Sequence, residues 1–132
     1  MRANGPFEIK MSPQTTHDAA ASTGLGRMSS AKQFHGDLEG TSIGEMLAVR
    51  TEVQGSAGYV AMEFVTGTLH GRSGSFVLQH SSTMARGAQN QNITVVPDSG
   101  TGQLAGLAGQ MVIHIAEGKH SYEFEYVLTD AP

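Results

Sequence analysis

The sequence contains no cysteine and no tryptophan, and charged residues make up only 15% of its positions. Without cysteine the chain cannot form a disulfide, a thiolate nucleophile or a cysteine-bound zinc site. No stretch approaches the roughly 20 apolar residues that a membrane-spanning helix needs. The formal net charge of −4 provides no basic surface for a phosphate backbone or an anionic membrane, so we expect neither nucleic acid nor membrane as a partner.

The first residues, "MRANGPFEIKM", also lack the apolar core segment of a signal peptide, and we therefore expect a cytoplasmic protein. At 132 residues the chain is long enough to bury one hydrophobic core, which predicts a single domain over residues 1–132. Its six histidines show neither H-x-H nor HExxH spacing. We accordingly predict no metal site and no other cofactor.

Glycine is abundant, with 17 residues, and many of these glycines separate short segments in which apolar and polar residues alternate. A period of two predicts β-strands, here about eight, near residues 6–12, 27–37, 42–51, 58–66, 75–84, 91–97, 103–115 (interrupted) and 120–128. Strands this close in sequence pair antiparallel, and closure of the sheet removes its free edges. The sequence therefore predicts an all-β, eight-stranded antiparallel closed barrel with little or no helix. Residues 12–26 are predicted to form a mobile loop between the first two strands.

Folding each predicted hairpin about its turn indicates which side chains face the interior. Turns at Glu117-Gly118 and Arg86-Gly87 direct one apolar set inward, comprising Phe76, Leu78, Ile93, Ile113, Tyr122 and Phe124. Turns at Glu39-Gly40 and Gly55-Ser56 direct a second set inward, comprising Ile43, Glu45, Leu47, Val60, Met62 and Phe64, and leave Glu63 outside beside Arg50. A slip of one residue in any turn would invert that hairpin, because the side-chain period is two.

The polar side chains assigned to this apolar interior are the candidate ligand-pocket residues, namely Lys32, Glu45, His80, His120 and Tyr122. A buried charge is costly unless it is paired, so Lys32 and Glu45 are expected to form an ion pair. Glu63 stays a candidate because a one-residue slip would turn it inward. Two interpretations of His80 remain open: a neutral core residue with one satisfied N–H, or an acid–base partner or ligand anchor in a cavity.

The segment "HGRSG" at residues 70–74 allows two interpretations. Gly71, Arg72 and Gly74 could form a nest of backbone N–H groups that binds an anion. The preferred interpretation is a hairpin turn that uses glycine for its positive φ and leaves Arg72 in solvent. The later glycine-rich segment "GTGQLAGLAG" leads into a strand, not a helix, and is therefore not a dinucleotide-binding fingerprint.

Four segments carry a family resemblance: "KQFHGDLEGTS", "GRSGSFVLQHSSTM", "ITVVPDSGTGQLAGLAGQM" and "GKHSYEFEYVL". They resemble a bacterial family of unknown function, the domain-of-unknown-function 3224 family, which is grouped by fold with the allene oxide cyclase-like barrels. The resemblance covers about residues 27–128 and implies an eight-stranded barrel that forms dimers or trimers. Plant allene oxide cyclases of this fold group enclose a fatty-acid epoxide in an apolar cavity, and dirigent proteins guide radical coupling. No residue here aligns with their functional residues.

Three functional hypotheses follow. The leading one is a barrel that binds a small, largely apolar molecule in its lumen or mouth. The second is an enzyme of cyclase or isomerase type that acts by confining its substrate. The third is a structural or self-association module with a filled lumen, in which outer-face Val77, Val96 and Val112 form an apolar interface.

Overall fold

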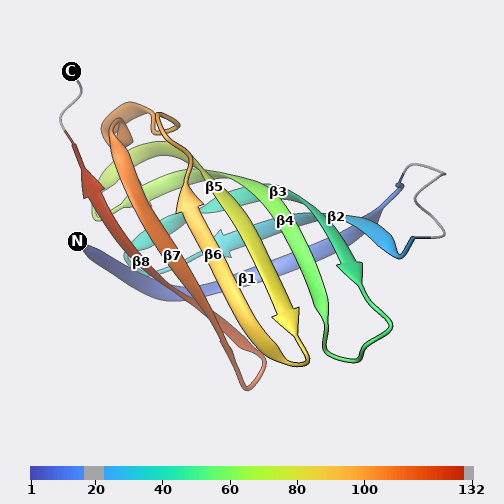
Figure 1. Cartoon of the computed structure of the whole chain (residues 1–132). Helices are drawn as coiled ribbons and strands as arrows, with labels where there is room; N and C mark the ends of the chain where they lie inside the picture. Colours follow the sequence, from blue (N-terminus) through green and yellow to red (C-terminus); the bar gives the residue numbers. More distant parts are fainter. Residues whose placement is uncertain (17–22, 130–132) are drawn as a thin grey trace.

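The protein forms a closed barrel of eight antiparallel strands, and its computed structural model describes residues 1–16 and 23–129 (Figure 1). The strands are β1 (Arg2–Gln14), β2 (Leu25–Phe34), β3 (Leu38–Arg50), β4 (Ala57–Leu69), β5 (Arg72–Ala85), β6 (Ala88–Val95), β7 (Leu107–Ala116) and β8 (Lys119–Leu128). Each strand pairs with the next in sequence, and β1 pairs with β8 to close the barrel. The predicted fold class is confirmed.

Two predicted boundaries need correction. Residues 12–14 end β1 and residues 25–26 begin β2, so the predicted loop 12–26 is partly strand, and its residues 17–22 lie outside the described part of the chain. The predicted strand 103–115 begins only at Leu107, because Gly102–Leu104 form the short 3₁₀ turn η2. Among the described residues no helix is long and apolar enough to cross a membrane.

Three hairpins close with two-residue turns in which both residues have positive φ. The pairs are His70-Gly71, Arg86-Gly87 and Glu117-Gly118, with φ values of 47° and 81°, 51° and 92°, and 52° and 76°. Such turns match the right-handed twist of the strands they join, and the second position suits glycine. Two of these turns are where the sequence predicted them. The third shows that "HGRSG" is a hairpin connection, the preferred interpretation of that segment.

The predicted turn between β2 and β3 is wrong, and its position decides which residues face the lumen. Phe34 pairs with Gly40, so the chain reverses at residues 35–37, where Gly36 has a φ of 94°. The displacement from Glu39-Gly40 corresponds to an odd shift in pairing, which exchanges the two faces of β3. Glu45 therefore lies outside and Glu63, on β4, lies inside instead of beside Arg50.

The same shift places an apolar set on the outer surface, contrary to the prediction that it lines the interior. Its members are Ile43, Leu47, Val60, Met62 and Phe64, all of them exposed. The predicted hairpins β5–β6 and β7–β8 are confirmed, since His80 pairs with Ile93 and Tyr122 pairs with Ile113. Pairing strands by their apolar side chains predicted the wrong inward face for β3 and β4, because the outer face of these strands is as apolar as the inner face.

The barrel is densely filled at the end where β2–β3, β4–β5 and β6–β7 connect (Figure 1). The fully buried side chains here are large, among them Phe34, Leu38, Leu69, Phe76, Leu104, Tyr122 and Phe124. The rings of Phe76 and Phe124 stack with centroids 5.8 Å apart, and Phe34 meets Tyr122 edge-on at 5.6 Å. This packed half supplies the hydrophobic core of the protein.

Tyr122 fixes the β2–β3 turn within this core. Its hydroxyl accepts a hydrogen bond from the backbone N–H of Leu38 and donates one to the carbonyl oxygen of His35, both at 2.8 Å. Gly5 lies directly opposite Tyr122, where a Cβ would come within 2.0 Å of the same carbonyl. The close approach of the turn to β1 therefore requires glycine at position 5.

We expect Tyr122→Phe to lower the free energy of unfolding by about 2 kcal/mol, because the substitution leaves the buried N–H of Leu38 without a partner. Urea denaturation followed by circular dichroism measures this loss. Tyr59→Phe is the matched control, since the Tyr59 hydroxyl bonds Ser82 and its ring is only partly buried in the other half of the barrel. Equal losses in the two variants would contradict the assigned role of Tyr122.

Candidate ligand site

The second half of the barrel is hollow because the strands direct small side chains inward there. Ser30 on β2 pairs with Gly44 on β3, and Ala61 on β4 pairs with His80 on β5. These positions leave a cavity of about 280 Å³. Its apolar walls include Phe7, Ile9, Met46, Ile113 and Ile115, and its polar lining includes Lys32, Glu63, His80 and His120. The lumen is thus filled at one end and open at the other.

Four buried side chains form the polar floor, namely Lys32, Glu63 and His80, which line the cavity, and Ser42, which bonds Glu63. The Oε1 atom of Glu63 lies 2.7 Å from Nε2 of His80 and 3.1 Å from Nζ of Lys32. Its Oε2 atom accepts a hydrogen bond of 2.5 Å from the Ser42 hydroxyl. Three donors on one carboxylate satisfy the requirement that a buried charge be paired and hydrogen-bonded.

The order of the strands brings the polar floor together. Lys32, Ser42, Glu63 and His80 come from β2, β3, β4 and β5, which are neighbours in the barrel. Lys32 stands directly opposite Ser42 in the ladder, and the inward faces of β4 and β5 place Glu63 next to His80. The Lys32 ammonium also lies 4.9 Å from the centroid of the Phe7 ring, an attractive cation–π distance.

Glu63 is held as a carboxylate. Burial, the largest influence, raises its pKa, but the hydrogen bond from His80, the charge of Lys32 and the hydrogen bond from Ser42 together lower the pKa to about 2. A carboxylate with so low a pKa is a poor proton carrier at neutral pH, where general acid–base catalysis favours a pKa near 7. The role of Glu63 is therefore to anchor Lys32 and His80.

Two members of the polar floor retain hydrogen-bonding capacity. An ionised carboxylate only accepts, so Nε2 of His80 is the donor in the bond to Glu63. Among the described residues every fully buried side-chain nitrogen and oxygen has a hydrogen-bond partner. The Nδ1 atom of His80 has no such bond among the described residues, so this atom is not fully buried. Lys32 uses one of its three N–H donors, on Glu63.

The structure brings four of the predicted pocket residues to one cavity, since Lys32, Glu63, His80 and His120 all line it. The His120 ring lies beside Phe7, with the centroids 5.3 Å apart. Tyr122 was predicted to join them but belongs to the packed half.

Glu45, the sixth predicted pocket residue, is on the outer surface and pairs with Arg27, so the expected Lys32–Glu45 pair is replaced by Lys32–Glu63. Sequence reasoning did not identify Ser42 as part of the site. Had the turn been placed at residues 35–37, the alternation of inward and outward residues along β3 would have put Ser42 inside, opposite Lys32.

The residues of the proposed anion nest are spread along the β4–β5 hairpin. Gly71 is in the turn, Arg72 begins β5 with an exposed side chain, and Gly74 packs against Thr101. A Cβ at Gly74 would lie 2.1 Å from the Thr101 carbonyl oxygen, so this glycine permits the loop after β6 to approach β5.

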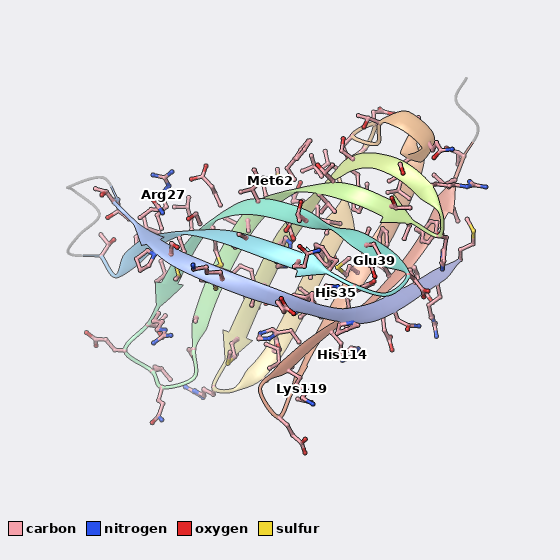
Figure 2. All side chains as sticks on the ribbon, turned by 180° about the vertical axis from the view of Figure 1, so that it is seen from behind. Arg27, His35, Glu39, Met62, His114 and Lys119 are labelled. Atoms are coloured by element: carbon pink, nitrogen blue, oxygen red, sulfur yellow. The ribbon has the colours of Figure 1, made fainter. Side chains whose placement is uncertain are left out.

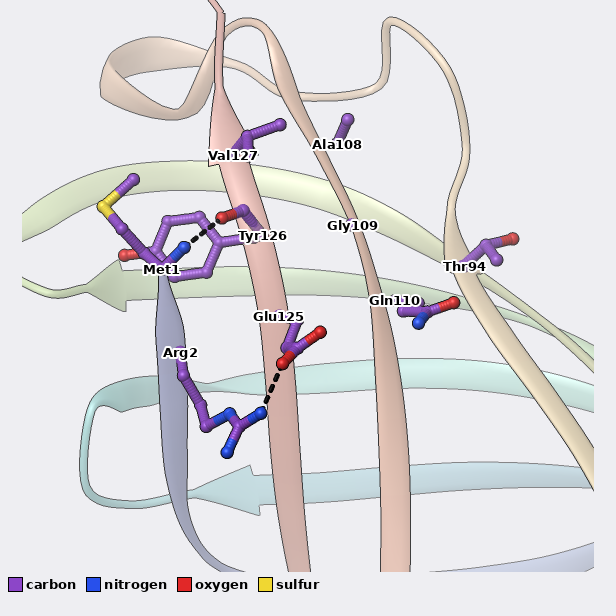
Figure 3. A pocket seen from close by; sticks show the side chains of 9 residues that line it. All are labelled: Met1, Arg2, Thr94, Ala108, Gly109, Gln110, Glu125, Tyr126 and Val127. Carbon is purple, nitrogen blue, oxygen red and sulfur yellow. Dashed lines mark hydrogen bonds and ion pairs between the residues drawn. The ribbon is translucent and has the colours of Figure 1, made fainter.

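A larger depression of about 680 Å³ lies on the outer surface between β1, β7 and β8 (Figure 3). Its charged groups are the Arg2–Glu125 ion pair, at 2.5 Å, and the terminal ammonium of Met1, which donates to the Tyr126 carbonyl at 2.8 Å. Both Arg2 and Glu125 are largely exposed to solvent. Exposed ion pairs contribute little to binding or stability, and the enclosed cavity is the better candidate site.

In residues 1–16 and 23–129 no group of three or more His, Asp or Glu side chains is placed to hold a metal ion. Residues 3–126 match the family described as "Protein of unknown function (DUF3224)". The chain belongs to this family.

Similarity to a solved structure extends over the whole barrel. A crystal structure, at 1.84 Å resolution, of a DUF3224-family protein with unknown function from Shewanella oneidensis MR-1 shares 45% sequence identity with this chain. The alignment covers 98% of each chain, with a TM-score of 0.92. A comparison with curated proteins finds no match.

We expect Glu63→Gln to lower the free energy of unfolding at neutral pH by about 3 kcal/mol, because it leaves the buried Lys32 charge uncompensated. The lowered pKa of Glu63 means that the wild type loses this advantage as the pH falls from about 4.5 to about 2. Urea denaturation at a series of pH values should therefore show the stabilities of wild type and variant converging across this window. Glu45→Gln, on the surface, is the control, and a constant difference between wild type and Glu63→Gln would contradict the assignment.

Proposed function

We propose that the hollow half of the barrel binds a small, largely apolar molecule whose polar head rests on the polar floor. The observation that carries the proposal is a cavity lined by both Lys32, which has donors beyond the one used on Glu63, and His80, whose Nδ1 has no hydrogen-bond partner among the described residues. A few convergent polar groups in an apolar enclosure are typical of small-molecule sites. The volume of about 280 Å³ lies just below the usual range for such pockets and favours a small ligand.

The polar floor indicates the chemistry of the ligand's head. Lys32 offers N–H donors, whereas the neutral form of His80, with its proton on Nε2, offers a lone pair on Nδ1. A head that accepts one hydrogen bond and donates another matches both groups. Phenols and enols meet this description through a single oxygen, whereas an ionised carboxylate only accepts. The apolar walls from Phe7, Ile9 and Ile113 would surround the remainder of the molecule.

Binding is favoured over acid–base catalysis by the state of Glu63. Its three hydrogen bonds and a pKa of about 2 support an anchoring role for this carboxylate. The resemblance to allene oxide cyclase-like barrels suggests a second hypothesis, in which the protein catalyses a cyclisation or isomerisation by confining a substrate in the same cavity. That hypothesis rests on fold analogy alone, and we propose the binding role.

4-Butylphenol and 4-butylanisole are suitable probes, because they share the apolar part and differ in the ability to donate from the head. We expect 4-butylphenol to shift the amide resonances of Ala61 and Ile113 in ¹H–¹⁵N NMR titrations. The ether should bind at least about tenfold more weakly, since it cannot donate to His80 and one lost hydrogen bond is worth about 1.4 kcal/mol.

Ala61→Leu places a larger side chain in the cavity beside His80 and should abolish the shift of Ile113. Ala116→Leu, at an exposed position of β7, is the matched control and should leave that shift unchanged. A wild-type protein that shows no shift at saturating 4-butylphenol, or an Ala61→Leu variant that binds as well as the wild type, would contradict the proposal.

A further inference from the structure

The outer surface of β3 and β4 carries large apolar side chains that the barrel does not cover. Five residues define this β3–β4 face, with exposed fractions of 68% for Ile43, 46% for Leu47, 52% for Val60, 53% for Met62 and 48% for Phe64. Ile43 pairs with Phe64 and Leu47 pairs with Val60 across the two strands, with Met62 between these pairs. They form one continuous patch, extended by the partly exposed Val77 on β5, opposite Phe64.

The β3–β4 face is nearly free of charge. Over residues 43–47 of β3 and 60–64 of β4, Glu45 is the one ionisable side chain that points outward, and Arg27 from β2 pairs with it. Figure 2 shows Arg27 and Met62 projecting outward from this side of the barrel. Other strands present ionisable groups outward, such as Glu123 and Glu125 on β8. In a chain of net charge −4, the β3–β4 face is therefore a region where a second copy can approach without repulsion.

The exposed area is close to what self-association requires. The five residues leave roughly 550 Å² accessible, compared with the about 800 Å² that each partner contributes to an interface of standard size. Homodimer interfaces are also more apolar than the rest of a protein surface. The Arg27–Glu45 pair and the polar residues around the face would supply the remaining area as a polar rim.

The β3–β4 face is grooved. Two shallow grooves that share Met62 lie on it, with volumes of about 500 and 650 Å³. One is bordered by Ile43 and Phe64, and the other by Leu47 and Val60. Two sheets can pack face to face, and a twofold axis brings the same face of both copies together.

We propose that the β3–β4 face is the surface through which two copies of this chain associate. The strands of this face are paired on both sides, β3 with β2 and β4 with β5, so association proceeds by face packing and not by addition of a strand. This interface lies on the outer surface, and its formation does not depend on the ligand proposed for the cavity.

Sedimentation velocity at increasing protein concentration tests the proposal. The wild type should sediment as a dimer at high micromolar concentration. Met62→Glu should raise the dissociation constant at least about thirtyfold, the loss expected for a central hot-spot side chain. Met62 is exposed in the single barrel, so the thermal unfolding of this variant should change little. Val112→Glu, at an exposed apolar position of β7, is the control and should sediment as the wild type does.

Cross-linking provides a second measurement that does not require a charge on this face. The chain has no cysteine, so Met62→Cys introduces a single thiol. Mild oxidation with copper phenanthroline should join two copies of this variant through a disulfide between the introduced thiols, whereas the thiols of Val112→Cys should not be cross-linked. A wild type that is monomeric at high micromolar concentration would overturn the proposal. So would a dimer that Val112→Glu dissociates and Met62→Glu does not.

Discussion

The buried carboxylate of Glu63 is the interaction on which the organisation of the cavity depends. It lies between Lys32 and His80, and a third donor, the Ser42 hydroxyl, completes its hydrogen bonds. An isolated charge at this depth would be strongly unfavourable, and these donors make the ionised state the stable one. The same bonds orient the ammonium and the imidazole, so the groups that face the cavity are held in position before any ligand arrives. Such preorganisation reduces the entropic cost of binding.

The two halves of the barrel differ in how their interiors are filled. Large aromatic and aliphatic side chains fill one end, and Tyr122 ties the β2–β3 turn to that core. At the other end Ser30, Gly44 and Ala61 leave space that a barrel of eight strands would otherwise fill with its own side chains. Because the packed half stabilises the fold, the other half can carry small inward side chains that leave a cavity.

The strand pair with the fewest ladder positions, β6 and β7, lies beside the cavity. β6 and β7 share only two ladder positions, Ile93 with Met111 and Thr94 with Gln110. Beyond them the side-chain oxygen of Gln91 accepts a hydrogen bond from the Ile113 N–H at 2.9 Å, in place of a backbone partner. Gln91 and Ile113 both line the cavity, so the cavity borders the least extensively paired strands of the barrel.

Alternation and glycine turns were sufficient to predict the closed barrel, because strand pairing follows from short connections and a period of two. The same reasoning found the turns at Arg86-Gly87 and Glu117-Gly118, and with them the inward positions of His80 and His120. The predicted faces of β3 and β4 were wrong for a physical reason. Both faces of these strands carry apolar residues, so burial in the core and exposure on a surface patch leave the same pattern in the sequence. Once Glu63 was assigned to the wrong face, the partner of Lys32 could not be identified. The correct assignment depends on the turn at residues 35–37, which is fixed by the distant Tyr122 and Gly5 and leaves no local signal.

The ionised, buried state of Glu63 can be observed directly by following the ¹³C chemical shift of its side-chain carboxyl group during an acid titration. If Lys32, His80 and Ser42 hold the charge, the carboxylate stays ionised until the pH approaches about 2. A titration midpoint at or above the ordinary value of 4.5 would show that these donors do not hold the charge, and would contradict the proposed organisation of the site.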